Sequence, residues 1–195
     1  MIVPLGVEPF VIVLAGPNGA GKSTFYELFL EGMPAPFVNA DRIARSVLLD
    51  RPASDYESAR IAEAERRHLV AERRSFIMET VFSDPAGDKV RFLMQAHRDG
   101  WFVCLVYIGL DRPEISAARI AHRVRNGGHS VPAAKIAPRY RRSLANLRKA
   151  LRFVDHAWLY DNSYAPYRRV AEVACGRTLW CATALPSWAG RSLPH

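Results

Sequence analysis

Cysteine is scarce in this chain of 195 residues, which contains only Cys104, Cys175 and Cys181. No two of them form a Cys-x-x-Cys pair, and any disulfide scheme leaves one of them over. This usage favours a reducing compartment with buried structural thiols, so we expect a cytoplasmic location. Cys104 lies in an apolar run, where we expect a core thiol rather than a reactive one.

Long apolar runs are missing as well. None reaches the roughly 18 residues that a membrane helix needs, and the first residues lack the basic region of a signal peptide. Internal repeats and low-complexity linkers are also absent. We therefore expect one domain over residues 1–195, without a membrane partner, and a terminal extension at about residues 185–195 that is free to fray.

Charge of one sign is in excess, since the formal net charge is +8. The basic residues concentrate between positions 112 and 152. A basic field concentrates anionic partners such as nucleotides, nucleotide sugars or nucleic acid. The alternative is a solvated basic helix face, and charge alone does not decide between the two.

The pattern of apolar residues alternates between strands and helices. Strands are predicted at 10–15, 37–41, 75–80, 101–110, 158–161 and 168–175, and helices at 22–31, 41–73 (broken near 52), 85–98, 113–125 and 132–152. This alternation predicts an α/β fold with a mostly parallel central sheet between helical layers. Ligands of such sheets bind beyond the carboxyl ends of the strands, where the chain places Asp41 and the pair Glu79 and Thr80.

The strongest motif follows the first predicted strand. It fits the phosphate-binding pattern GxxxxGK[ST] with Gly16, Pro17, Asn18, Gly19, Ala20, Gly21, Lys22 and Ser23, and Thr24 comes next. Such a loop points backbone N–H groups at phosphate oxygens, and the helix that follows adds its positive end. We expect Lys22 to reach the β- and γ-phosphates of ATP and the Ser23 hydroxyl to bind Mg²⁺. A merely structural turn is the alternative.

The remainder of the chain favours a kinase over other P-loop proteins. No apolar run ends in the Asp-Glu pair of a motor or transport ATPase. The basic segment at about 119–143 instead fits a lid that excludes water from the transferring phosphoryl group. The predicted fold is therefore the three-layer sandwich of P-loop NTPases and kinases.

Candidate catalytic residues follow from these positions. Asp41 ends a strand near the loop, where it would take the proton of an acceptor hydroxyl or, alternatively, cap the next helix. Glu79 would bind the acceptor or help to position Mg²⁺, or else form a strand-end salt bridge. Thr80 and Ser83 would donate to the acceptor or satisfy the turn.

The predicted lid contains three arginines. Arg119 and Arg123 share a helix face, whereas Arg125 points elsewhere unless the helix ends first. The glycines at 127 and 128 suggest a hinge for closure over the nucleotide. Arg123 is the first candidate for a clamp on the γ-phosphate, and a surface position is the alternative.

Taken together, these motifs resemble the zeta toxin family of P-loop kinases over about residues 10–163. The resemblance rests on residues 16–24, Asn39-Ala40-Asp41, Glu79-Thr80, the run 107–111, and then Arg119, 123–124, 127–132, 139–140, 143–147 and 160–163. It implies phosphorylation of a nucleotide sugar, UDP-N-acetylglucosamine in the toxins, at a sugar hydroxyl. It also implies that an antitoxin protein is a possible partner.

The resemblance assigns roles by position. Lys22 would hold the ATP phosphates, Asp41 would be the general base, and Arg123 would stabilise the transferring phosphoryl group. Glu79 would bind the acceptor. Asn39 and Thr80, which lie in the same motifs, and the lid arginine Arg139 complete the substrate-binding set.

The chain departs from the toxins at two places. His129 stands where they have a second catalytic lid arginine, with Arg125 and Arg139 as candidate substitutes. Thr80 and Val81 stand where they have glycine and threonine. The short Gly-Gly-His lid is similar to that of stand-alone members of the family, whose substrates need not be the toxin substrate.

Three rival functions stay open. One is an antibiotic O-phosphotransferase of the chloramphenicol-kinase type. Another is an RNA-binding protein that uses ATP as a switch, although no aromatic cluster interleaves with the basic residues 139–142 to stack bases, so nucleic acid is not the expected partner. The third is an inactive module that only binds an antitoxin, which the presence of Lys22, Ser23 and Asp41 disfavours.

Overall fold

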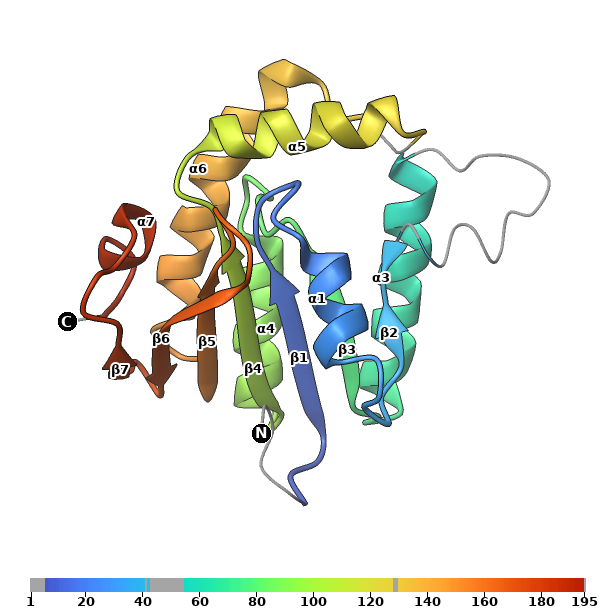
Figure 1. Ribbon diagram of the computed structural model, residues 1–195. Coiled ribbons are helices and arrows are strands. Elements are labelled where there is room, and N and C mark those ends of the chain that lie inside the picture. The colour runs from blue at the N-terminus through green and yellow to red at the C-terminus, as the bar shows by residue number, and fades with distance from the viewer. Residues whose placement is uncertain (1–5, 41, 43–54, 128–129, 195) are drawn as a thin grey trace.

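The computed structural model describes residues 6–40, 42, 55–127 and 130–194. Within these residues one sheet has the strand order β2-β3-β1-β4-β5-β6-β7 (Figure 1). The pairs from β2 to β5 are parallel, and β6 and β7 add antiparallel edge strands. The strands are β1 (Phe10–Ala15), β2 (Phe37–Val38), β3 (Phe76–Thr80), β4 (Phe102–Gly109), β5 (His156–Asp161), β6 (Arg168–Ala174) and β7 (Arg177–Cys181).

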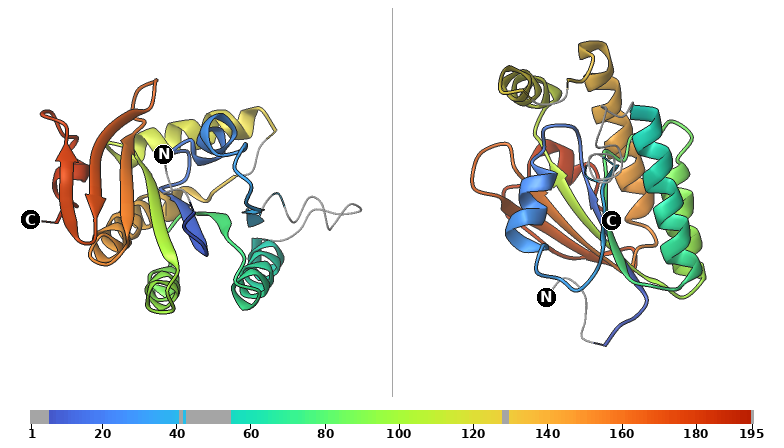
Figure 2. Two further views of the ribbon diagram at one scale, coloured as in Figure 1. Left: turned by 90° about the horizontal axis from the view of Figure 1, so that it is seen from below. Right: turned by 90° about the vertical axis from the view of Figure 1, so that its right-hand side faces the viewer.

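Helices cover both faces of the sheet. Figure 2 shows α1 on one face and α3, α4 and α6 on the other, while α5 crosses beyond the strand ends in Figure 1. These helices are α1 (Lys22–Phe29), α3 (Asp55–Ala71), α4 (Asp88–Arg98), α5 (Pro113–Arg125) and α6 (Ala133–Ala150). No described helix combines the length and the apolar composition that crossing a bilayer requires.

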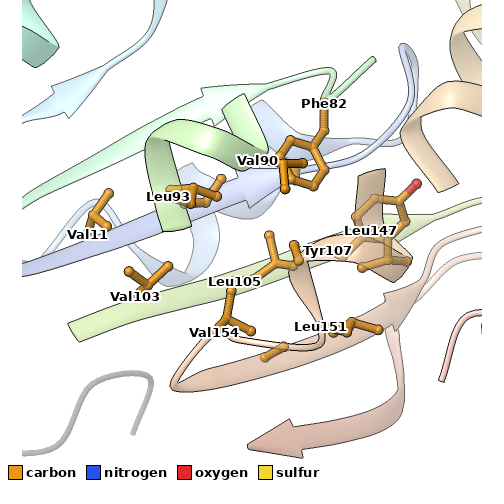
Figure 3. Packing of buried hydrophobic residues seen from close by; sticks show 14 of the residues in the cluster. Val11, Phe82, Val90, Leu93, Val103, Leu105, Tyr107, Leu147, Leu151 and Val154 are labelled. Carbon is orange, nitrogen blue, oxygen red and sulfur yellow. The ribbon is translucent and has the colours of Figure 1, made fainter. Parts of the chain in front are cut away.

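The central strand β1 supplies both halves of the core. Val11 and Val13 point to the side of α3, α4 and α6, whereas Ile12 and Leu14 point to the side of α1. All four side chains are fully buried, as expected of a parallel strand covered on both faces. Figure 3 shows the larger half, in which Leu93 and Leu147, among others, pack around the sheet. The carboxyl ends of β1 and β3 are thereby fixed side by side.

The predicted α/β fold with a mostly parallel sheet is confirmed, and the boundaries differ in places. The second strand ends at Val38. Of the helical region predicted over 41–73, the structure describes helical backbone at Arg42 and then α3, and positions 41 and 43–54 lie outside the described residues. Strand β7 was not predicted. It is an edge strand whose side chains are nearly all exposed, so it carries no apolar alternation to mark it.

The C-terminal segment corrects the expectation of a frayed extension. A short helix, α7 (Ser187–Gly190), buries the indole of Trp188 to 1% exposure. Its Nε1 donates to Asp161 Oδ1 over 3.1 Å, and its ring packs against Tyr107. A single tryptophan in a Pro-rich tail gives no periodic signal, which is why this contact was not predicted.

Gly109 leaves the space that Trp188 fills. A Cβ at this position would lie 2.2 Å from Cζ2 of the indole, so Gly109→Ala forces the ring out of its site. We expect a loss of about 1–3 kcal/mol in the free energy of unfolding, measured by urea denaturation. Gly32→Ala is the matched control, because nothing lies within 4 Å of its added Cβ. Equal stability of the two variants would show that Trp188 does not depend on this space.

Candidate functional site

The loop between β1 and α1 has the backbone that its glycines require. Gly19 and Gly21 have φ values of 71° and 90°, in the left-handed region that residues with a side chain rarely adopt. Gly16 is required for a second reason, because a Cβ there would lie 2.2 Å from the carbonyl oxygen of Ile108 on β4. The loop therefore lies tightly against the sheet.

Distant segments hold the carbonyl groups of this loop. Asn162 Nδ2 donates to the carbonyl of Ala20 over 2.9 Å, and the Tyr167 hydroxyl donates to that of Gly21 over 2.7 Å. From α5, the Ser116 hydroxyl donates to the carbonyl of Asn18. In a trans peptide the following N–H points the opposite way, so amides at 19, 21 and 22 face away from these partners. This is the arrangement that an anion-binding loop needs.

The carboxylate of Glu79, at the end of β3, joins three parts of the site. Its Oε2 accepts from the Ser23 hydroxyl over 3.1 Å and from Asn39 Nδ2 over 2.9 Å. Its Oε1 lies 3.7 Å from Lys22 Nζ, which also donates to the carbonyl of Pro17. Lys22 and Asn39 are buried, so these charges and dipoles act with little screening by water.

A cavity of about 440 Å³ opens over this cluster. Its walls come from the loop and α1, the ends of β2 and β3, α3, α5 and α6. The lining residues are Asn18, Gly19, Gly21, Lys22, Ser23, Thr24, Ala40, Ser58, Glu79, Val81, Arg119, Arg123, Ser130, Val131 and Arg139. Basic residues of the lid segment thus face a phosphate-type loop across one cavity.

Most of the predicted site residues meet at this cavity. Asn39 reaches it through its bond to Glu79, and Thr80 lines an adjoining cavity. Within the loop, Gly16, Pro17 and Ala20 shape the backbone without being among the lining residues. Arg125, proposed as a substitute lid arginine, is exposed and is not among them either. Asp41 and His129 lie outside the described residues.

Arg119 is a site residue that the sequence analysis noted without assigning it a role. It lines the cavity, and its guanidinium donates to the carbonyls of Gly19 and Ser163. The spacing of Arg119 and Arg123 on one helix face was the signal for both. Tyr167, which holds the loop at Gly21, was missed because no motif surrounds it.

The turn after β5 links the loop to the C-terminal segment. Ser163 Oγ donates to Asp161 Oδ1 over 2.8 Å and accepts from the backbone N–H of Asp111 over the same distance. Asp161 also accepts from Trp188, and the adjacent Asn162 holds Ala20. Residues 160–163 belong to the stretch that resembles the zeta toxin family, and these bonds show what they hold in place.

Helix α6 holds the other wall of the site. Asn146 Nδ2 donates to the carbonyls of Phe82 and Asp84, and Arg142 Nε donates to that of Ser83. Phe82 has a φ of 58°, an uncommon value for an aromatic residue, and is fully buried. Such strained positions persist only where the surroundings fix them, so the segment after β3 has a defined shape. Ser83, predicted to contact an acceptor or the turn, here accepts through its backbone.

Burial raises the pKa of two side chains that serve the scaffold, Tyr140 and Cys104. Burial raises the pKa of Tyr140 to about 12, with a smaller contribution from the charge of Asp111. Its hydroxyl therefore stays protonated and donates to the carbonyl of Leu110 over 2.8 Å. Burial also raises the pKa of the Cys104 thiol, in keeping with the predicted core role.

Few oxygen atoms that could bind a metal ion lie at the described part of the site. The described residues include no group of three or more His, Cys, Asp or Glu side chains placed to hold a metal ion. Ser23 and Glu79 supply a hydroxyl and a carboxylate next to each other. Asn18 Oδ1 is buried and has no hydrogen-bond partner among the described residues, so one acceptor at the cavity is left unsatisfied.

Comparison with known proteins agrees with this geometry. The model of the family described as AAA domain (AAA_33) matches residues 11–147, from β1 to within α6. The chain belongs to this family. An uncharacterized protein of Haemophilus influenzae is 31% identical over 130 residues, which cover 66% of this chain and 91% of that protein.

Solved structures share the fold across most of the chain. A chain of the AvrRxo1-ORF1:AvrRxo1-ORF2 complex superposes with a TM-score of 0.64 at 16% identity, over 97% of this chain and 65% of that one. A chain of the PezAT chromosomal toxin-antitoxin system of Streptococcus pneumoniae gives 0.62 at 16% identity, over 85% and 71%. A chain of the Pnkp1/Rnl/Hen1 RNA repair complex gives 0.57 at 20% identity, over 73% and 46%.

At these sequence identities, the superpositions show a shared fold and nothing more. The chain spans 65% of the length of the AvrRxo1 chain and 46% of that of the RNA repair chain, so only part of each larger protein is matched. The AAA_33 family match and the PezAT superposition together establish a P-loop kinase-like fold.

Proposed function

We propose that this protein is an ATP-dependent phosphotransferase of zeta toxin type, which transfers the γ-phosphoryl group to a hydroxyl of a small acceptor. The convergence of Lys22, Ser23, Glu79 and the lid arginines on one cavity carries the proposal. Two relatives in fold support it. One AvrRxo1-ORF1:-ORF2 structure is described as containing ATP, and the PezAT system is described as a toxin-antitoxin system.

In the proposed reaction the acceptor oxygen forms a bond to the γ-phosphorus of ATP. The bond from that phosphorus to the β,γ-bridging oxygen breaks, and ADP leaves with the electron pair. Asp41 takes the hydroxyl proton, while Arg123, which lines the cavity, stabilises the charge on the transferring group. Lys22 would contact the β- and γ-phosphates in place of its hydrogen bond to the Pro17 carbonyl.

The residues present fit Mg²⁺. Magnesium in such sites is held by one or two protein oxygens together with phosphate oxygens, and the neighbouring oxygens of Ser23 and Glu79 match that need. When bound, the ion would neutralise phosphate charge. The role of this chain is to orient the Ser23 hydroxyl, which Glu79 does through the 3.1 Å hydrogen bond.

The acceptor is the open part of this proposal. The resemblance to the toxins favours a nucleotide sugar such as UDP-N-acetylglucosamine, with Asn39, Glu79, Thr80 and Arg139 at the acceptor. An antibiotic-type acceptor is the second candidate, and Val81 and Val131 in the cavity wall are apolar residues that favour it. A protein partner of antitoxin type and a cytoplasmic location belong to the same proposal.

The general-base role is tested with Asp41→Asn. We expect acceptor phosphorylation to fall by at least about a hundredfold, because the amide cannot take the hydroxyl proton. The affinity for ATP should be unchanged. The assay follows transfer from γ-labelled ATP into UDP-sugars, sugar phosphates, antibiotics and RNA, and calorimetry measures ATP binding. Near-normal turnover of the variant would exclude Asp41 as the general base. Label in RNA alone would favour the RNA-directed rival.

The lid offers a matched pair for the clamp role. Arg123 lines the cavity, whereas Arg125, two residues further along the same helix, is exposed and does not line it. Arg123→Ala should lower kcat by about 10²–10³-fold, the usual effect of removing one donor to a developing charge. Arg125→Ala should stay within twofold of the wild type. The clamp assignment is wrong if the two variants have equal kcat values.

A further inference from the structure

A second cavity of about 380 Å³ adjoins the first on the side of α3 and α4. The two share Ala40 and Glu79 in their linings, so the second cavity lies next to the first, with the Glu79 carboxylate at their common border. The remaining lining residues are Ala59, Arg60, Ala62, Glu63, Arg66, Thr80 and Lys89.

Positively charged side chains surround Glu63, the carboxylate that α3 contributes to the described lining of this cavity. Glu63 accepts from Arg66 Nη2 and from Lys89 Nζ through Oε2, and from Arg67 Nε through Oε1. Burial alone would raise the pKa of Glu63, but the hydrogen bond and charge of Arg66, with those of Lys89, lower it to about 2. Both oxygens of Glu63 are engaged, so this carboxylate is poorly placed to bind a cationic ligand.

Arg66 is the central cation of this cavity. Its side chain is only 7% exposed, and its charged partner is Glu63. Arginine is almost never buried to this extent without such a partner. A guanidinium carries five N–H donors, and the bond to Glu63 is made through Nη2 alone. The cavity thus has a buried cation with donor capacity beyond its ion pair. Glu79, the other carboxylate in the lining, is already matched by Lys22.

The apolar part of the lining is small. It consists of Ala40, Ala59 and Ala62, and none of the described lining residues is aromatic. A nucleobase is usually held by an aromatic face or a broad apolar surface, and the described lining residues include neither. Arg66 and Lys89 place positive charge among these small side chains, which favours a compact, anionic ligand.

We infer that this second cavity binds the anionic group of the acceptor, and that the acceptor is a compact polyol or sugar carrying one phosphate or carboxylate. Arg66 and Lys89 hold the anion, and the acceptor hydroxyl points past Glu79 toward the γ-phosphate. This inference rests on the proposed phosphotransferase function and narrows its acceptor class to compact anions, for which the described lining supplies cations among small side chains.

The test compares charged and uncharged acceptors of equal size. Glucose 6-phosphate is paired with glucose and gluconate with sorbitol, and UDP-N-acetylglucosamine is included. Transfer is measured from γ-labelled ATP, and binding by calorimetry in the presence of a non-hydrolysable ATP analogue. Arg66→Gln should raise KM for the preferred anionic acceptor at least tenfold, with kcat and KM for ATP within twofold.

Arg67→Gln is the matched control, because Arg67 also pairs with Glu63 but its side chain is 79% exposed on the solvent side of α3. It should leave every parameter unchanged. Arg66→Lys keeps the charge and should retain part of the affinity, and the split between a raised acceptor KM and an unchanged KM for ATP separates anion binding from a merely structural ion pair with Glu63. If Arg66→Gln is unfolded by circular dichroism, Lys89→Gln, at a position with 26% side-chain exposure, gives the same readout.

The outcomes separate this inference from the proposed function. Transfer to uncharged polyols or to UDP-N-acetylglucosamine in preference to the compact anions overturns the inference and leaves the kinase standing. Binding of an anionic polyol that Arg66→Gln abolishes, without transfer to any acceptor, supports the cavity and counts against the kinase. Failure of every anionic polyol to bind overturns the inference.

Discussion

The ion pair between Lys22 and Glu79 is the interaction on which the site depends. It joins the first turn of α1 to the end of β3, and Ser23 and Asn39 bind the same carboxylate. Both charged groups are largely withdrawn from water, with side-chain exposures of 6% and 15%. Removing one partner of a buried pair typically costs about 3–5 kcal/mol, because the remaining charge is left uncompensated.

This pair also imposes an electrostatic condition on any phosphate ligand. A phosphate chain in the loop brings negative charge close to Glu79, and two anions in a poorly solvated cavity need cations between them. Lys22 is one such cation, and Arg119 and Arg123 face the cavity from α5. Of the basic residues that the sequence concentrates between 112 and 152, Arg119, Arg123 and Arg139 line the cavity that opens over this carboxylate.

Sequence reasoning succeeded where one short motif determines the backbone. The loop 16–21 was predicted residue by residue, because a tight turn against β4 admits only glycine at position 16. Glu79 was located correctly at a strand end, but its bonds to Ser23 and Asn39 were not foreseen, since the partners lie 56 and 40 residues away. Tyr167 and Trp188 were missed for the same reason, because each makes long-range contacts that no periodicity marks.

The two cavities that Glu79 borders differ in the ligand that each one suits. The first has the loop and the lid arginines, which suit a phosphate chain, and the second has a buried arginine among small side chains, which suits a compact anion. Glu79 borders both, so it is the one described carboxylate positioned to respond to the nucleotide and to the acceptor together.

The most direct test of this account follows the phosphorus atoms of ATP by ³¹P NMR in the presence of Mg²⁺ and the acceptor panel. The account predicts that the γ resonance is replaced by a phosphomonoester signal in step with the appearance of ADP. Release of inorganic phosphate alone, at the same rate with and without acceptors, would show an ATPase and would contradict the assignment of this site to phosphoryl transfer.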